Sequence, residues 1–158
     1  MLQIMNTEAI VNKIKNQGMK IATAESCTGG LLASTLTEIS GVSDIFEGGI
    51  IAYSNRVKQE RLHVSKEFLD TYGAVSEQVA KAMSTSVCDY VHADIGISIT
   101  GVAGPSCSEN KPVGLVYYSI YIKPHNILLC EKLQLKGTRA QIRKKTVEKV
   151  LTHLDQLL

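Results

Sequence analysis

Apolar residues recur along this chain with two different periods. Spacing of three and four residues predicts helices at residues 7–17, 31–40, 55–62, 65–72, 76–91 and 138–158. Runs rich in alternating and β-branched residues predict strands at residues 19–25, 48–53, 94–100, 113–123 and 127–135. Helices and strands therefore alternate over most of the chain.

The first and last helices carry the clearest signals. Thr7 is the expected N-cap of the first helix and Gly18 its stop. Near the other end, Thr138 and Gln141 form a capping-box pattern. Apolar stripes at helical spacing follow both starts: Ile10, Val11 and Ile14, then Val147, Val150, Leu151, Leu154, Leu157 and Leu158. Each stripe is expected to face a sheet.

Alternation of this kind predicts a single α/β domain over residues 1–158, because helices then cover both faces of one sheet. The chain of 158 residues has the common size of one domain. Only Pro124-His125-Asn126 separates the last two strands, which predicts an antiparallel hairpin. We therefore expect a three-layer α/β/α sandwich with a mixed sheet.

The composition argues against several classes of protein, namely those that bind nucleic acid, membranes or metal ions. A formal net charge of +2 is too small to indicate nucleic acid or an anionic membrane as a partner. Cysteines and histidines are scattered without zinc-ligand spacing, so we expect no metal and no other cofactor. No apolar run approaches the roughly 18 residues of a membrane span. No signal peptide is apparent, and the expected location is the cytoplasm.

Ligands of open α/β sheets bind beyond the carboxyl ends of the strands. The first loop in such a position carries Ser26 on a sharp strand-to-helix turn, followed by Thr28, Gly29 and Gly30. Glycines allow close backbone approach, and a helix N-terminus stabilises negative charge. Ser26 is therefore a candidate nucleophile, with the next residues as oxyanion or phosphate donors. An ordinary capped turn is the alternative.

The second loop, residues 53–58, places Lys58 one turn inside a short helix. Serine–lysine pairs perform acyl transfer when burial lowers the lysine pKa, because the neutral amine can then accept the serine proton. Lys58 is the candidate base, since no histidine lies in these loops. A solvated surface lysine is the alternative.

The third loop and the start of the last helix supply candidate ligand contacts. Small residues before Pro105 suit the backbone to lie against a flat ring or ribose, and those candidates are Thr100, Gly101, Ala103 and Gly104. Arg139 and Arg143, one turn apart at a helix start, can clamp a phosphate monoester. The alternatives are a tight strand exit and a solvated basic face.

Five motifs stand out when the loops are taken together: Ala24-Glu25-Ser26-Cys27-Thr28-Gly29-Gly30, Tyr53-Ser54-Asn55-x-x-Lys58, Gly73-Ala74-Val75-Ser76-Glu77, Gly101-Val102-Ala103-Gly104-Pro105 and Lys111-Pro112-Val113-Gly114. In this order the chain resembles the CinA C-terminal domain family, which includes stand-alone nicotinamide-nucleotide amidohydrolases of the PncC type. The similarity covers nearly the whole chain.

The resemblance implies hydrolysis of the carboxamide of nicotinamide mononucleotide to nicotinate mononucleotide and ammonia. It implies a five-stranded mixed sheet and a serine–lysine pair, with Ser26 as nucleophile, Lys58 as base and Tyr53 nearby. Asn55 and the third loop would line the nucleotide pocket, and Arg139 rather than Arg143 is the better match for the phosphate. The expected partner is a small nucleotide substrate, with a homo-oligomer left open.

One segment departs from the family pattern. Many relatives have a glycine-rich stretch where this chain has Ser106-Cys107-Ser108-Glu109-Asn110, and the segment here is slightly shorter. The departure bears on the shape of the pocket and on substrate preference. It leaves a second hypothesis open, a non-catalytic nucleotide-binding or competence- and damage-inducible regulatory protein.

Overall fold

Five strands form one mixed sheet in the computed structural model, which describes residues 6–158. They are β1 (Ile21–Glu25), β2 (Phe46–Ile51), β3 (Ile95–Gly101), β4 (Leu115–Ile122) and β5 (Ile127–Gln134). Their order is β2-β1-β3-β4-β5. β1 is parallel to both of its neighbours, while β4 is antiparallel to β3 and β5. The predicted mixed sheet, its hairpin and its five strands are confirmed.

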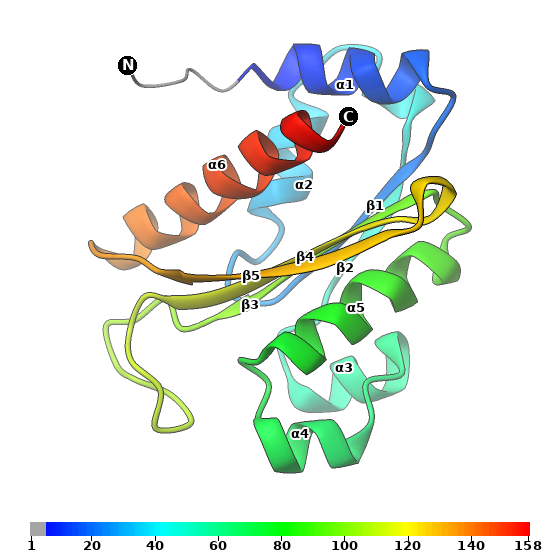
Figure 1. The fold of residues 1–158 in the computed structure, drawn as a ribbon. Helices are drawn as coiled ribbons and strands as arrows, with labels where there is room; N and C mark the ends of the chain where they lie inside the picture. The colour runs from blue at the N-terminus through cyan, green and yellow to red at the C-terminus, as the bar shows by residue number, and fades with distance from the viewer. Residues whose placement is uncertain (1–5) are drawn as a thin grey trace.

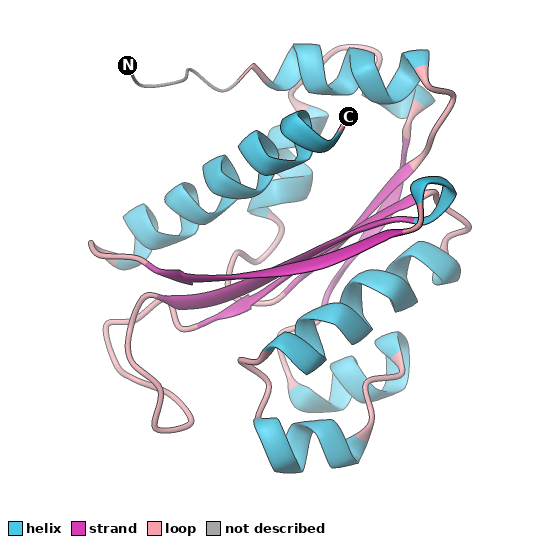
Figure 2. Ribbon diagram, viewed as in Figure 1, coloured by secondary structure: helices cyan, strands magenta, loops and turns pink. Residues whose placement is uncertain are grey.

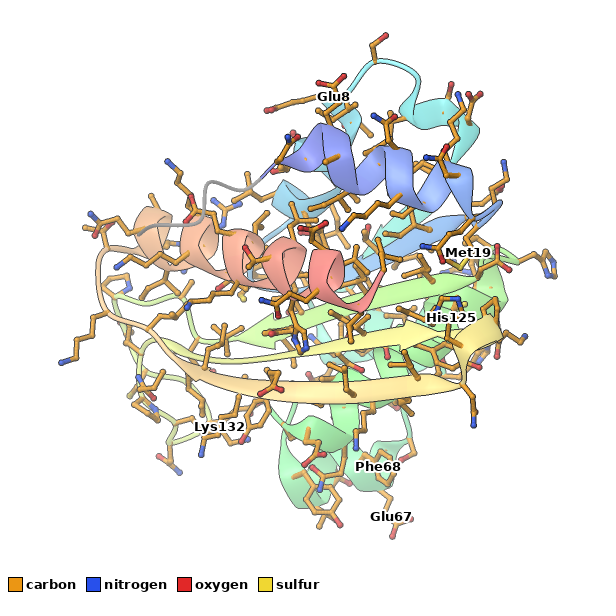
Figure 3. All side chains as sticks on the ribbon, turned by 45° about the horizontal axis from the view of Figure 1, so that its top comes forward. Glu8, Met19, Glu67, Phe68, His125 and Lys132 are labelled. Carbon is orange, nitrogen blue, oxygen red and sulfur yellow. The ribbon has the colours of Figure 1, made fainter. Side chains whose placement is uncertain are left out.

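Helices cover both faces of this sheet (Figures 1 and 2). On one face lie α1 (Thr7–Asn16), α2 (Leu31–Thr37) and α6 (Arg139–Leu157), and on the other α3 (Asn55–Leu62), α4 (Lys66–Tyr72) and α5 (Glu77–Tyr90). Glu8 of α1 and Glu67 of α4 lie at opposite ends of the molecule in Figure 3. The three-layer α/β/α sandwich is confirmed. Across residues 6–158, no helix combines the length and apolar character needed to span a membrane.

The predicted apolar stripes are buried. α1 buries Ile10, Val11 and Ile14. α6 buries most of its stripe behind the Thr138–Gln141 capping box, in which each side chain bonds to the other residue's backbone. Both helices pack on the same face of the sheet, where their side chains form one core with β3 and β4. Hydrophobic burial is the main stabilising term in such a layer.

Element ends differ from the prediction by a few residues. Asn6 rather than Thr7 caps the first helix, because the Asn6 side chain accepts a hydrogen bond from the Ala9 amide at 3.0 Å. The second helix stops at Thr37, and a short 3₁₀ turn at Val42–Asp44 follows it. β2 ends at Ile51, which leaves residue 53 in the following loop.

The topology brings several loops to one edge of the sheet. Parallel pairing of β1 with β2 and β3 places the carboxyl ends of these three strands side by side. β4 starts and β5 ends at the same edge, because β4 runs antiparallel to β3 and β5 antiparallel to β4. α6 follows β5 after a short loop, so its N-terminus also lies there.

Gly96 of β3 lets α5 approach the sheet closely. A Cβ at this position would lie 2.8 Å from the Cβ of Cys88 and would collide with the carbonyl oxygen of Ser84. Both of those residues belong to α5. The backbone of α5 therefore rests directly on β3.

Replacing Gly96 with alanine should reduce the free energy of unfolding by about 1–3 kcal/mol, because the added methyl group forces α5 away from β3. Chemical denaturation followed by circular dichroism measures this change. An unchanged denaturation midpoint would contradict the close contact between α5 and β3.

Candidate active site

A cavity of about 630 Å³ lies at the edge where β1, β2 and β3 end. All three loops singled out in the sequence contribute to its wall. The lining residues are Ser26, Cys27, Tyr53, Asn55, Lys58, Ala74, Val75, Thr100, Gly101, Val102, Ala103, Gly104, Pro105, Ser106, Ser108, Glu109 and Arg139.

Ser26 is held by the sheet itself. Its amide donates to the Ile99 carbonyl oxygen at 2.9 Å, and the carbonyl of the preceding Glu25 accepts from the Ala52 amide at 2.8 Å. The Glu25–Ser26 peptide is therefore bonded on one side to β3 and on the other side to Ala52, just past the end of β2. Ser26 is therefore fixed at the floor of the cavity, directly after β1.

Lys58 reaches Ser26 from α3. The Ser54 side chain caps this helix by accepting from the Val57 amide, and this N-cap lies four residues before the lysine. The Lys58 Nζ donates to Ser26 Oγ at 3.1 Å and to the Tyr53 carbonyl oxygen at 3.4 Å. Lys58 is only 2% exposed, and no carboxylate within residues 6–158 pairs with it.

Burial lowers the pKa of Lys58 below its usual range, because desolvation disfavours the charged amine. The negative charge of Glu109 acts in the opposite direction and is outweighed. The cavity therefore favours a neutral amine beside the serine hydroxyl. That protonation state is the one a lysine base requires.

Cys27 is next to Ser26 and also lines the cavity, but burial raises the pKa of its thiol to about 11. The thiol is therefore protonated at neutral pH, and a protonated thiol is a poor nucleophile. Of the two neighbouring side chains, Ser26 is the one with a base in contact.

The Glu25 carboxylate caps α2. Its Oε1 accepts from Thr28 Oγ1 at 2.7 Å and from the Leu32 amide at 2.8 Å, and Oε2 accepts from the Ala33 amide at 3.0 Å. The buried carboxylate thus occupies donors that a helix start would otherwise offer to a ligand. This role was not predicted from the sequence, because Glu25 lies seven residues before Leu32 and outside the usual capping patterns.

The predicted donors Thr28, Gly29 and Gly30 do not line the cavity. The Gly29 amide donates to the Ser26 carbonyl oxygen at 3.0 Å, which closes the turn. In the described part of the chain, the Cys27 amide donates to no other residue. Cys27 lines the cavity next to Ser26, so its amide is the candidate donor for a ligand there.

Arg139 lies at the start of α6 and on the cavity wall. Its Nη1 donates to the Gly104 carbonyl oxygen at 2.6 Å, and Nη2 donates to the Tyr53 hydroxyl at 2.8 Å. Arg139 thus joins the second and third loops. Tyr53 uses its carbonyl for Lys58 and its hydroxyl for Arg139.

Arg143 lies outside the cavity lining. Its Nε donates to the Cys27 carbonyl oxygen at 3.2 Å and its Nη2 to the Thr28 carbonyl oxygen at 2.8 Å. The side chain therefore ties the Ser26 turn to α6 instead of pointing into the cavity. Its phosphate role remains a prediction that this placement does not favour.

Thr100, Gly101, Ala103 and Gly104 all line the cavity, as does Asn55. The Thr100 hydroxyl donates to the Ala74 carbonyl oxygen at 2.9 Å, which draws residues 73–75 to the same wall. No role was predicted from the sequence for Ala74, Val75 or Glu109, although the first two lie in the motif Gly73-Ala74-Val75-Ser76-Glu77. These residues reach the cavity through hydrogen bonds between loops that lie far apart in the sequence, so no local pattern identifies them.

Within residues 6–158, no three histidine, cysteine, aspartate or glutamate side chains form a cluster that could hold a metal ion. The cavity combines a buried serine–lysine pair, a free backbone amide and one arginine. This set of groups is suited to acyl transfer on a small anionic molecule.

The sequence profile of the CinA C-terminal domain matches residues 4–158. The chain belongs to the CinA C-terminal domain family. A curated CinA-like protein from Kosmotoga olearia is 49% identical over 137 residues, which make up 86% of this chain and 33% of that protein. The chain spans about a third of the length of the curated relatives it matches.

Solved structures of CinA proteins share the fold over almost their whole length. The competence/damage inducible protein CihA from Agrobacterium tumefaciens is 35% identical with a TM-score of 0.88, and the match covers 99% of both chains. A CinA superfamily protein from Escherichia coli is 30% identical with a TM-score of 0.92. That match covers 99% of this chain and 95% of the other.

Replacing Glu25 with alanine should reduce the free energy of unfolding by about 3 kcal/mol, because the buried Thr28, Leu32 and Ala33 donors lose their acceptor. Chemical denaturation measures the loss. The matched control is Glu47→Ala, an exposed glutamate on β2, for which a change within about 0.5 kcal/mol is expected. Equal effects in the two variants would contradict a capping role for Glu25.

Proposed function

We propose that this chain is a nicotinamide-nucleotide amidohydrolase, which hydrolyses the carboxamide of nicotinamide mononucleotide to nicotinate mononucleotide and ammonia. The observation that carries the proposal is the 3.1 Å contact between the buried Lys58 Nζ and Ser26 Oγ. A lysine buried beside a serine, with no carboxylate to neutralise it, is costly unless it is neutral. A neutral amine in that place can act as a base.

In the first step, Ser26 Oγ attacks the carboxamide carbon while the neutral Lys58 amine takes the hydroxyl proton. The carbonyl π bond opens, and its oxygen becomes an oxyanion. The Cys27 amide is the donor available for that charge, since Cys27 lines the cavity and its amide donates to no other residue of the described chain. Donors of this kind typically contribute about 100- to 1,000-fold in rate.

In the second step, the protonated Lys58 gives its proton to the departing nitrogen. The carbon–nitrogen bond breaks, ammonia leaves and an ester joins the nicotinoyl carbon to Ser26. Water then attacks this ester with Lys58 again as the base, and the serine leaves with the proton. The sum is one amide and one water converted to one carboxylic acid and one ammonia.

Two features support a nucleotide as the substrate. Arg139 on the cavity wall carries a guanidinium, which can bind a phosphate monoester. The loop of small residues at positions 100–105 leaves backbone and little side chain facing the cavity, which suits a flat ring or a ribose. The identity of the nucleotide comes from the family resemblance, because such features are common to many nucleotides.

Ser26→Ala and Lys58→Met should each lower ammonia release from nicotinamide mononucleotide by at least about 1,000-fold, because the nucleophile or its base is removed. Ammonia detection on purified protein measures the rate, and circular dichroism checks that each variant folds. Lys149→Met, which changes an exposed lysine of α6, is the matched control and should keep full activity.

Two outcomes would overturn this proposal. Full activity in either site variant would mean that the serine–lysine pair does not perform the chemistry. Binding of nicotinamide mononucleotide by the unmodified protein without ammonia release would favour the nucleotide-binding regulatory hypothesis.

The activity should also depend on pH with a defined sign. Since Lys58 must be neutral, kcat/KM should rise with pH through the Lys58 pKa, and this limb should lie below the ordinary lysine value of 10.5. Lys58→Arg should be inactive at every pH, because a guanidinium is not deprotonated in proteins. A rate that falls over this limb would contradict a neutral lysine base.

A further inference from the structure

Residues 106–111 form a small hairpin at the edge of the cavity. The Lys111 amide donates to the Ser108 carbonyl oxygen at 2.8 Å, and the two residues form an antiparallel bridge. Glu109 and Asn110 occupy the turn with φ values of 55° and 58°. The left-handed region is unfavourable for a residue with a Cβ, and residues held there often serve a site.

The Glu109 side chain binds a neighbouring backbone segment. Its Oε1 accepts from the Ala74 amide at 2.9 Å and its Oε2 from the Val75 amide at 3.2 Å. The Lys111 Nζ lies 3.2 Å from Glu109 Oε2 and donates to the carbonyl oxygens of Tyr72 and Val75, both at 2.6 Å. One ion pair therefore satisfies four backbone groups of residues 72–75.

Gly73 shows how closely this ion pair fits. A Cβ there would lie 2.5 Å from Glu109 Oε2 and 2.8 Å from Lys111 Nζ. The segment it binds includes Ala74 and Val75, which line the cavity. The hairpin thus builds part of the wall through contacts that no local pattern in the sequence encodes.

We propose that Glu109 is a positioning residue of the active site, which holds Ala74 and Val75 in the cavity wall and keeps a negative charge in the same cavity as Lys58. The proposal rests on the amidohydrolase function proposed above.

The charges around Lys58 support this role. The titratable groups that line the cavity with it are Cys27, Tyr53, Glu109 and Arg139. Burial acts to raise the pKa of Glu109, but the bonds from the two amides and from Lys111 outweigh it and lower that pKa. Glu109 is therefore a carboxylate at neutral pH, and its charge raises the pKa of Lys58 against the effect of burial.

Two variants test the proposal with opposite changes of charge. Glu109→Gln keeps the shape but has one acceptor oxygen for two amides, and it removes the negative charge. Lys111→Met removes the cation and its bonds to the carbonyl oxygens of residues 72 and 75. Glu131→Gln, an exposed glutamate of β5, is the matched control.

The first measurement is amide hydrogen exchange of residues 73–76, which needs no substrate. In Glu109→Gln, exchange at Ala74 and Val75 should be roughly tenfold faster, the effect of one lost charge-assisted hydrogen bond. Lys111→Met should also exchange faster there, and the control should match the unmodified protein. Unchanged exchange in Glu109→Gln would overturn the positioning role, whether or not the protein is an amidohydrolase.

The second measurement is ammonia release from nicotinamide mononucleotide as a function of pH. The expected KM rises by roughly tenfold in Glu109→Gln, with a smaller change in kcat, because the wall is loosened. The acid limb of kcat/KM should move to lower pH in Glu109→Gln and to higher pH in Lys111→Met. If the acid limbs of the two variants move in the same direction, or do not move, the proposed effect of the Glu109 charge on Lys58 is overturned.

The two proposals can fail separately. Absence of ammonia release by the unmodified protein would overturn the amidohydrolase function and the part of this inference that concerns Lys58. The exchange result would still decide whether Glu109 holds the wall. If one of the two variants does not fold, hydrogen exchange of residues 73–76 in the other variant tests the contact.

Discussion

A primary amine held out of water beside a serine hydroxyl is the constraint on which the rest of this structure depends. Lys58 is almost fully buried, and desolvation favours its neutral form. The fold meets this constraint by starting α3 at the end of β2 and setting β2 parallel to β1, which carries Ser26 just past its end. The amine, carried by α3, then meets the hydroxyl that follows β1.

Around this pair, each loop is held by a side chain from another part of the chain. Arg143 of α6 binds the carbonyls after Ser26, and Arg139 joins the other two strand-end loops. Glu109 holds the segment before α5. Such hydrogen bonds restrict the positions of the backbone groups around the cavity. This restriction is the preorganisation that electrostatic catalysis needs.

The sequence predicted the layers and the strands well, because apolar periodicity reports directly which face of an element is buried. Its errors lie at element ends such as Thr37 and Asn6, and at Asn6 a single side-chain hydrogen bond decides the boundary. Among the candidate site residues, Ser26, Lys58 and Arg139 line one cavity, whereas Thr28 and Arg143 do not. Their roles in catalysis and binding remain predictions.

By itself, the sequence determined the sandwich architecture, the strand-end loops and the family to which the chain belongs. Those follow from local patterns and from motifs in order, both of which are written along the chain. Only the tertiary structure decided that Glu25 caps α2, that Arg143 binds the carbonyls of residues 27 and 28, and that Glu109 accepts from the amides of residues 74 and 75. The reason is physical: each is a hydrogen bond whose partner is chosen by packing rather than by local sequence pattern.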